Sequence, residues 1–299
     1  MSGSKCDADG NLYIRKFASD RPTLGPVVKI DPDGRRTALF DPAAFSQLAL
    51  DRADAFSPAS DGGLYRIAQS GIVKPQIYVL HFLSDGTAST PVRLDADLEV
   101  YSFAAFADGD FLVSGVRRDG LDKKYAARNF TAVFSADGRE LVQLTFQEPQ
   151  NSASSQAKSG ATTPKDAIDT PVILDVSDAE PGNDGNLYVM RRSSPAVVYV
   201  IAPSGKTMRT IKVSSPLGEA APTGFHVSEN RLAISFWNEA SESQTVVIAD
   251  AQTGRKIASY GDPGGLGPAF ACYSANEGVF TFLKLGDGNT LDVTRAEPQ

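Results

Sequence analysis

The chain has 299 residues, a formal net charge of −7 and a hydrophobic fraction of 41%, the profile of a globular protein with a large core. The acidic balance argues against nucleic acid or an anionic membrane surface as a partner. No apolar run approaches the roughly 18 residues of a membrane span, and the opening "MSGSK" has no hydrophobic signal segment.

The first predicted element is a turn within "CDADGNLYIRK", residues 6–16. Its acidic oxygens around a glycine resemble the start of a calcium loop, but the twelfth position from Asp7 is Ala18, where such a loop needs Glu. Related pieces recur as "SDGGLYRI", "ADGDFLVSG" and "NDGNLYVMR". Asp-Gly and Asn-Gly between apolar runs are typical of hairpin turns. We therefore predict turns rather than metal loops.

Two series of turn glycines alternate along the chain. The first series is Gly10, Gly62, Gly109 and Gly185, and the second is Gly34, Gly86, Gly138, Gly205 and Gly254. Both have a period near 50 residues, so each unit contains two hairpin turns and hence four strands, which is typical of a propeller blade. Weaker copies at 225–237 and 270–283 bring the number of units to six. We predict an all-β, six-bladed β-propeller of four-stranded antiparallel blades forming a single domain over 1–299.

The predicted units, with strands a to d from the axis outward, start near Lys5, Asp54, Tyr101, Asp178, Thr223 and Ala269. Residues 147–171, between blades 3 and 4, are poor in large apolar side chains, and we expect a flexible inserted loop there. This loop is either a lid over the central opening of the propeller or a tolerated surface insertion. The last unit leaves no residues for strand d, so the sixth blade is either three-stranded or lacks a native N-terminal strand.

The units "DADGNLYI" and "NDGNLYV", followed by "VVKIDPDGRR" and "VVYVIAPSGK", resemble NHL-type six-bladed propellers. The tail from "AFACYSANEGVFTFL" to "VTRAEP" is similar to uncharacterised secreted bacterial propellers. The resemblance implies the fold, and a secreted or periplasmic location for the native protein. It implies little about function, because propellers serve as hydrolases, lyases, receptors and scaffolds.

Candidate ligand-binding residues lie on the face from which the b–c and d–a connections emerge, here called the funnel face. Starts of a strands and ends of b strands there supply acids, an aromatic residue and a ring of cations: Asp54, Tyr101, Arg66, Arg117, Arg118, Arg191 and Arg192. Arginine matches the geometry of carboxylates, so this set suits a polar or anionic ligand. The alternative is that these are solvated strand exits with structural ion pairs.

Candidate catalytic residues are His226 as a base, with Asp178 or Glu180 on the neighbouring blade as the group that orients it. A three-histidine zinc site, as in the lyase of the NHL type, is excluded because the chain has only His81 and His226. We interpret His81 as a packing residue. Asp54, Asp178 and Glu180 could supply oxygens for Ca²⁺ or Mg²⁺ in a lactonase-like enzyme, although no lactonase motif carries over to these positions.

Cys6 and Cys272 fall on strand a of blades 1 and 6, which are neighbours once the ring closes. Their offsets from the turn glycines place the two side chains on the same face of their strands but at different heights along the propeller axis. We therefore favour two buried free thiols over a disulfide. For function we predict a monomeric binding or interaction scaffold without a cofactor. Its partner is an unidentified protein or a small polar or anionic ligand, and the alternative is a metal-assisted lactonase or lyase.

Overall fold

The computed structural model describes residues 4–72, 75–94, 98–117, 128–144, 179–262, 269–287 and 290–297. The predicted inserted loop at 147–171 and the candidates Arg118 and Asp178 therefore lie outside the described residues. No helix within these ranges is long and apolar enough to cross a membrane.

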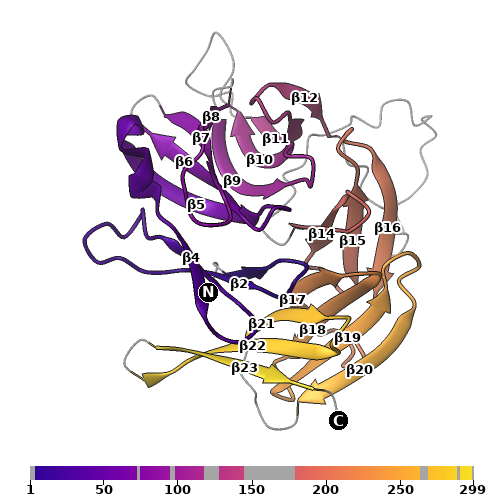
Figure 1. Cartoon of the computed structure of the whole chain (residues 1–299). Helices are drawn as coiled ribbons and strands as arrows, with labels where there is room; N and C mark the ends of the chain where they lie inside the picture. The colour runs from indigo at the N-terminus through magenta and orange to yellow at the C-terminus, as the bar shows by residue number, and fades with distance from the viewer. Residues whose placement is uncertain are drawn as a thin grey trace, which may run out of the picture.

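Within the described ranges, twenty-three strands form six antiparallel sheets arranged in a ring (Figure 1). Blades 1 to 3 consist of β1 (Ser4–Cys6), β2 (Leu12–Arg15), β3 (Val27–Ile30) and β4 (Arg36–Phe40); β5 (Leu50–Pro58), β6 (Leu64–Ser70), β7 (Gln76–Phe82) and β8 (Val92–Arg93); and β9 (Leu98–Ala105), β10 (Phe111–Arg117), β11 (Arg128–Phe134) and β12 (Glu140–Gln143).

Blades 4 to 6 consist of β13 (Ala179–Pro181), β14 (Leu187–Arg191), β15 (Ala196–Ile201) and β16 (Thr207–Val213); β17 (Ala221–Ser228), β18 (Arg231–Asn238), β19 (Ser243–Asp250) and β20 (Lys256–Asp262); and β21 (Ala269–Ser274), β22 (Val279–Leu285) and β23 (Leu291–Ala296). A short 3₁₀ helix, η1 (Pro42–Leu48), joins blades 1 and 2. The predicted six-bladed propeller is confirmed, and its last blade has three strands.

The predicted turns form because glycine accepts a positive φ. All nine glycines of the two turn series have φ between +72° and +92°, a conformation in which a Cβ would be strained. In the first turn, Asp7 Oδ1 accepts hydrogen bonds from the backbone N–H groups of Asp9 and Asn11, at 3.1 and 2.9 Å. The Asp7 carboxylate thus accepts hydrogen bonds from its own turn, as in an Asx turn, and the predicted turn is confirmed.

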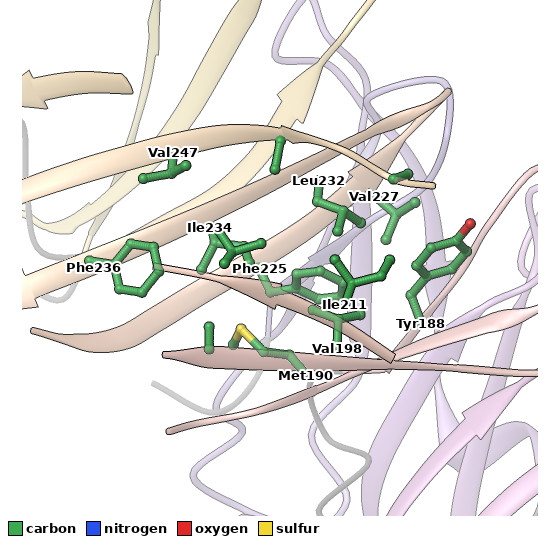
Figure 2. Packing of buried hydrophobic residues seen from close by; sticks show 14 of the residues in the cluster. Tyr188, Met190, Val198, Ile211, Phe225, Val227, Leu232, Ile234, Phe236 and Val247 are labelled. Atoms are coloured by element: carbon green, nitrogen blue, oxygen red, sulfur yellow. The ribbon is translucent and has the colours of Figure 1, made fainter. Parts of the chain in front are cut away.

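The hydrophobic core lies between neighbouring blades. Figure 2 shows the cluster between blades 4 and 5, in which Met190, Val198 and Ile211 face Phe225 and Ile234. Strand β15 is apolar at every position because both faces are covered: Val198 and Val200 pack toward blade 5, and Val197 and Tyr199 pack toward blade 3. Burial on both faces explains why the sequence reads as a continuous apolar run rather than an alternating one.

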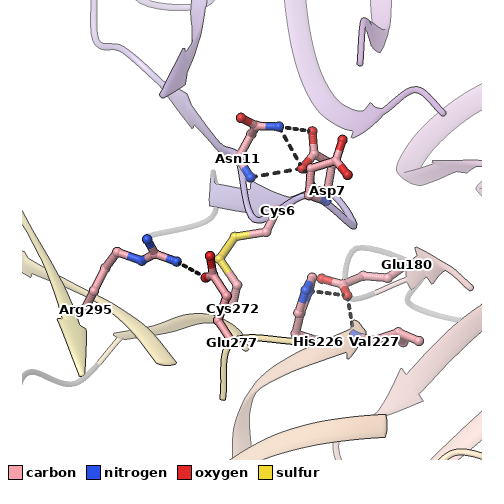
Figure 3. Close-up of a disulfide and its surroundings, with 10 residues drawn as sticks. Cys6, Asp7, Asn11, Glu180, His226, Val227, Cys272, Glu277 and Arg295 are labelled. Carbon is pink, nitrogen blue, oxygen red and sulfur yellow. Dashed lines mark hydrogen bonds and ion pairs between the residues drawn. A yellow bond between two sulfur atoms is a disulfide. The ribbon is translucent and has the colours of Figure 1, made fainter. Parts of the chain in front are cut away.

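The innermost strands β1, β5, β9, β13, β17 and β21 form a closed ring of neighbours. Blades 1 and 6 are joined by a disulfide between Cys6 and Cys272, with Cα atoms 6.0 Å apart (Figure 3). The preference for two free thiols was therefore wrong. The offsets from the turn glycines describe positions within each blade, whereas the approach of the two cysteines depends on how β1 and β21 pack against each other across the blade seam.

Candidate functional site

The funnel face is built from the entrance halves of the a strands, and four of these strands are irregular there. Register shifts occur in β5 between Ala53 and Phe56, in β9 at Tyr101, in β17 at Thr223 and in β21 between Phe270 and Cys272. A bulge leaves a residue outside the regular ladder and re-aims its side chain. Asp54, Tyr101 and Thr223, which the sequence placed at the starts of units, occupy three of these bulges.

Asp54 lies among arginines at the boundary of blades 1 and 2. Its carboxylate oxygens are 3.3 Å from Arg52 Nε and 3.9 Å from Arg15 Nη1. The side chain of Asp54 is 49% exposed and that of Arg52 is 40% exposed, so solvent screens these ion pairs and each contributes little to stability. The two guanidinium groups and the Asp54 carboxylate together carry a formal charge of +1 at an accessible position. The Asp51 carboxylate, which accepts a hydrogen bond from Gly71 N, lies on the same face.

Arg66 was expected in the outer basic ring at a strand exit, but this prediction was wrong, because its side chain is fully buried. Strand β6 continues to Ser70, so Arg66 lies inside the strand and not at its exit. The guanidinium donates hydrogen bonds to the carbonyl oxygens of Gly25, at 2.7 Å, and of Ala53. Burial, reinforced by the charge of Arg15, lowers the pKa of Arg66 to about 9. Arg66 thus ties the b–c loop of blade 1 to β5 from below the surface.

The other candidate cations that the structure describes, Arg117, Arg191 and Arg192, lie at or directly after strand ends, as expected. Arg117 ends β10, pairs with Glu140 and lies over the ring of Phe130 at 5.3 Å. Arg191 ends β14, and both Arg191 and Arg192 are exposed. They belong to different blades and are not brought together into one cluster with Asp54.

Three large apolar side chains on the funnel face are exposed to solvent. Phe17, in the b–c loop of blade 1, is 78% exposed; Ile72, in that of blade 2, is 82% exposed; and Tyr101 on β9 is 54% exposed. The loop that contains Phe17 is fixed on blade 2, because the backbone N–H of Ala53 donates to Thr23 O at 2.9 Å. Phe17, Ile72 and Arg52 were not among the predicted site residues. For Phe17 and Ile72, a large apolar residue inside a polar connection was a signal that the sequence offered.

Close to the axis, the structure brings together the predicted pair His226 and Glu180 from neighbouring blades 5 and 4 (Figure 3). His226 Nδ1 lies 2.8 Å from Glu180 Oε2, although the groups are not aligned as a hydrogen bond and Nδ1 has no such partner among the described residues. The same oxygen accepts a hydrogen bond from Val227 N at 2.8 Å. Both side chains are buried and the contact crosses the blade seam; its catalytic role stays a prediction.

Lys5 also reaches the inner ring, where its Nζ donates to Ala179 O at 2.9 Å. Since blades 1 and 4 lie opposite each other in a ring of six, this hydrogen bond crosses the centre of the ring. His81 lies on β7, away from the axis, and stacks on Tyr65 with ring centroids 4.4 Å apart. The interpretation of His81 as a packing residue agrees with this position.

The described residues do not assemble a metal centre from the candidate carboxylates. No group of three His, Cys, Asp or Glu side chains suited to a metal ion occurs in the described part of the chain. Asp54 is paired with arginines on blades 1 and 2, whereas Glu180 contacts His226 and Val227 on blades 4 and 5. The two carboxylates therefore serve separate networks.

No protein-family model matches the chain, and no curated protein matches it significantly. Solved structures that resemble it include a protein of unknown function from Bacteroides caccae, with 12% identity over 91% of this chain and 82% of that one (TM-score 0.43). Virginiamycin B lyase from Staphylococcus aureus has 14% identity over 99% and 84% (TM-score 0.46). Hydrazine synthase from Kuenenia stuttgartiensis has 11% identity over 94% and 75% (TM-score 0.47).

At these identities and TM-scores the similarities carry no argument about function. The blade topology itself defines the class of protein, a six-bladed β-propeller with a three-stranded last blade. Assignment to the NHL type stays a prediction.

Proposed function

We propose that the chain is a binding module that holds a carboxylate-bearing ligand, either a protein segment or a small molecule, on its funnel face. The observation that carries the proposal is the exposure of Phe17, Ile72 and Tyr101 on one face of adjacent blades, beside Arg15 and Arg52. Aromatic side chains and arginine are enriched in binding interfaces. Exposed apolar side chains supply contact area, and the excess positive charge around Asp54 favours an anionic group.

The buried contact between His226 and Glu180 favours a second candidate function, a hydrolase or lyase of the lactonase type. In this alternative Glu180 orients the imidazole and His226 acts as a general base. The proposed divalent ion, Ca²⁺ or Mg²⁺, would need oxygens beyond those that Glu180 offers, because one of its oxygens is already engaged by His226 and Val227. We prefer the binding module because Phe17, Ile72 and Tyr101 are exposed to a ligand, whereas His226 and Glu180 are buried.

We also propose that the native protein works in an oxidising compartment, outside the cell or in the periplasm. The Cys6–Cys272 disulfide supports this location, since structural disulfides persist mainly in such compartments.

The proposed function is tested by a thermal-shift screen of organic acids, acidic sugars and acidic peptides. We expect a carboxylate-bearing compound to raise the melting temperature of the wild-type chain, and Tyr101→Ala and Arg52→Ala to abolish the shift. Arg139→Ala is the matched control, because Arg139 follows the turn glycine Gly138 on the opposite face and is 70% exposed. A compound whose effect depends on Arg139 and not on Tyr101 would overturn the proposal.

A further inference from the structure

Blade 6 ends in an open edge. The other five blades have a fourth strand outside their c strand, whereas no described strand pairs with the outer edge of β23, the outermost strand of blade 6 in Figure 1. An open edge presents a row of unpaired N–H and C=O groups that can bind an extended segment. This edge lies away from the funnel face, so the inference does not depend on the proposed function.

Packing is thinner on both sides of blade 6. Counting described residues, the buried cluster between blades 4 and 5 has sixteen members, whereas those between blades 5 and 6 and between blades 6 and 1 have six and five. Elsewhere the d strand supplies part of this packing, as Phe40 does beside blade 2 and Ile211 and Val213 do beside blade 5. Val293 on β23 is 42% exposed. A strand with apolar residues at alternate positions would restore the missing layer.

The end of β23 carries a charge that such a strand can match. A surface pocket of about 410 Å³ there is lined by Glu277, Val279, Arg295 and Glu297. Arg295 is already bound to Glu277 at 2.7 Å and to Pro32 O of blade 1 at 3.1 Å. Two carboxylates and one guanidinium leave a formal charge of −1 at this end of the open edge.

The chain's own c–d turns and d strands show where cations lie in a complete blade. In blades 1, 3, 4 and 5 a basic residue directly follows the turn glycine before strand d: Arg35, Arg139, Lys206 and Arg255. In blade 4, Arg209 of β16 donates to Asp184 Oδ2 in the a–b turn at 3.1 Å. Arg35 and Arg139 instead pair with Asp33 and Asp137 of their own c–d turns. Blade 4 thus gives an example of a d-strand cation paired with an acid of the a–b turn within a complete blade.

We propose that the open edge of blade 6 binds an extended segment of a partner protein as its fourth strand, antiparallel to β23. The segment has a basic residue near its N-terminal end, over Glu277 and Glu297, followed by apolar residues at alternate positions. Main-chain hydrogen bonds to β23 provide affinity, and the apolar residues, which share one face of the strand, fill one of the two thin seams beside blade 6.

The probe is a fluorescently labelled synthetic peptide, KTMRTIKVS, which has the sequence of residues 206–214 and contains the d strand of blade 4. The control peptide has proline in place of Ile211 and the same charge, so nonspecific attraction to the acidic chain is retained while strand pairing is lost. We expect the control to bind at least tenfold more weakly in fluorescence anisotropy. We also expect Glu277→Lys with Glu297→Lys to weaken binding of the probe.

Two variants locate the binding edge. Adjacent strand residues point their N–H groups to opposite edges, so one of Val293 and Thr294 faces the open edge and the other faces β22. We expect one of Val293→Pro and Thr294→Pro to keep the wild-type melting temperature and lose probe binding at least tenfold. Equal binding of both peptides, or binding retained in both variants, would overturn the proposal. A wild-type dimer that dissociates in one of these variants would also overturn it, because the edge would then hold a second copy.

Discussion

Removing the Cys6–Cys272 disulfide is expected to destabilise the propeller more than any single substitution on its surface. The disulfide joins residues 266 positions apart and links the first innermost strand to the last. The chain-entropy model gives about 5.6 kcal/mol for a loop of this length, and measured values rarely exceed about 5 kcal/mol. We therefore expect a loss of about 3–5 kcal/mol, which corresponds to a fall of about 6–10 °C in melting temperature for a chain of this size.

The assay is calorimetry of the wild-type chain and of the Cys6→Ser, Cys272→Ser double variant, each with and without reductant. Reductant should lower the melting temperature of the wild-type chain to that of the double variant and leave the double variant unchanged. Thiol titration in denaturant should find no free thiol in the unreduced wild-type chain. Two titratable thiols, or equal melting temperatures in all four samples, would refute the reasoning.

Three further predictions follow from buried and charged groups. Arg66→Ala should lower the free energy of unfolding by about 3 kcal/mol, because it leaves Gly25 O and Ala53 O without their donor and opens a cavity. The control Arg15→Ala, at the partly exposed end of β2, should lower it by less than about 1 kcal/mol in urea unfolding. Asp41 is partly buried, which disfavours its charged form, but hydrogen bonds from Arg21 and Ala43 N outweigh burial and lower the pKa of Asp41. The free energy of unfolding should therefore fall as the pH drops below the pKa of the unfolded state, about 3.9. Unfolding between pH 5 and 2 should show a smaller fall for Asp41→Asn than for the wild-type chain. EDTA, Ca²⁺ and Mg²⁺ should leave the calorimetric midpoint unchanged, whereas a gain of about 2.7 kcal/mol at a hundredfold excess over Kd that Glu180→Gln removes would favour the enzyme instead.

The repeat was readable from sequence because each turn depends on a local property of one residue. Gly62 and Gly138, for example, adopt φ of +80° and +88°, and such positions recur wherever the blade must reverse direction. The common period of the two glycine series then indicated two hairpin turns, and hence four strands, in each unit. The contact of His226 with Glu180 was also predictable, because both residues lie on innermost strands of adjacent blades.

The positions that could not be predicted depend on register and strand length. The approach of Cys6 and Cys272 depends on how β1 and β21 pack across the blade seam, and offsets counted within each blade do not fix it. Arg66 looked like a residue at a strand exit, but four further residues of β6 follow it and carry it into the interior. The pairing of Arg15 and Arg52 with Asp54 arises between two blades, so it required the ring to be closed.

The central claim is that ligands bind on the funnel face, and hydrogen–deuterium exchange with a carboxylate-bearing hit from the thermal-shift screen tests it most directly. We expect slower exchange in residues 16–26, 50–54, 71–72 and 98–101, which connect or begin the strands of blades 1 to 3 on that face. Protection confined to the glycine turns of the opposite face, around Gly34, Gly62 and Gly138, would contradict it.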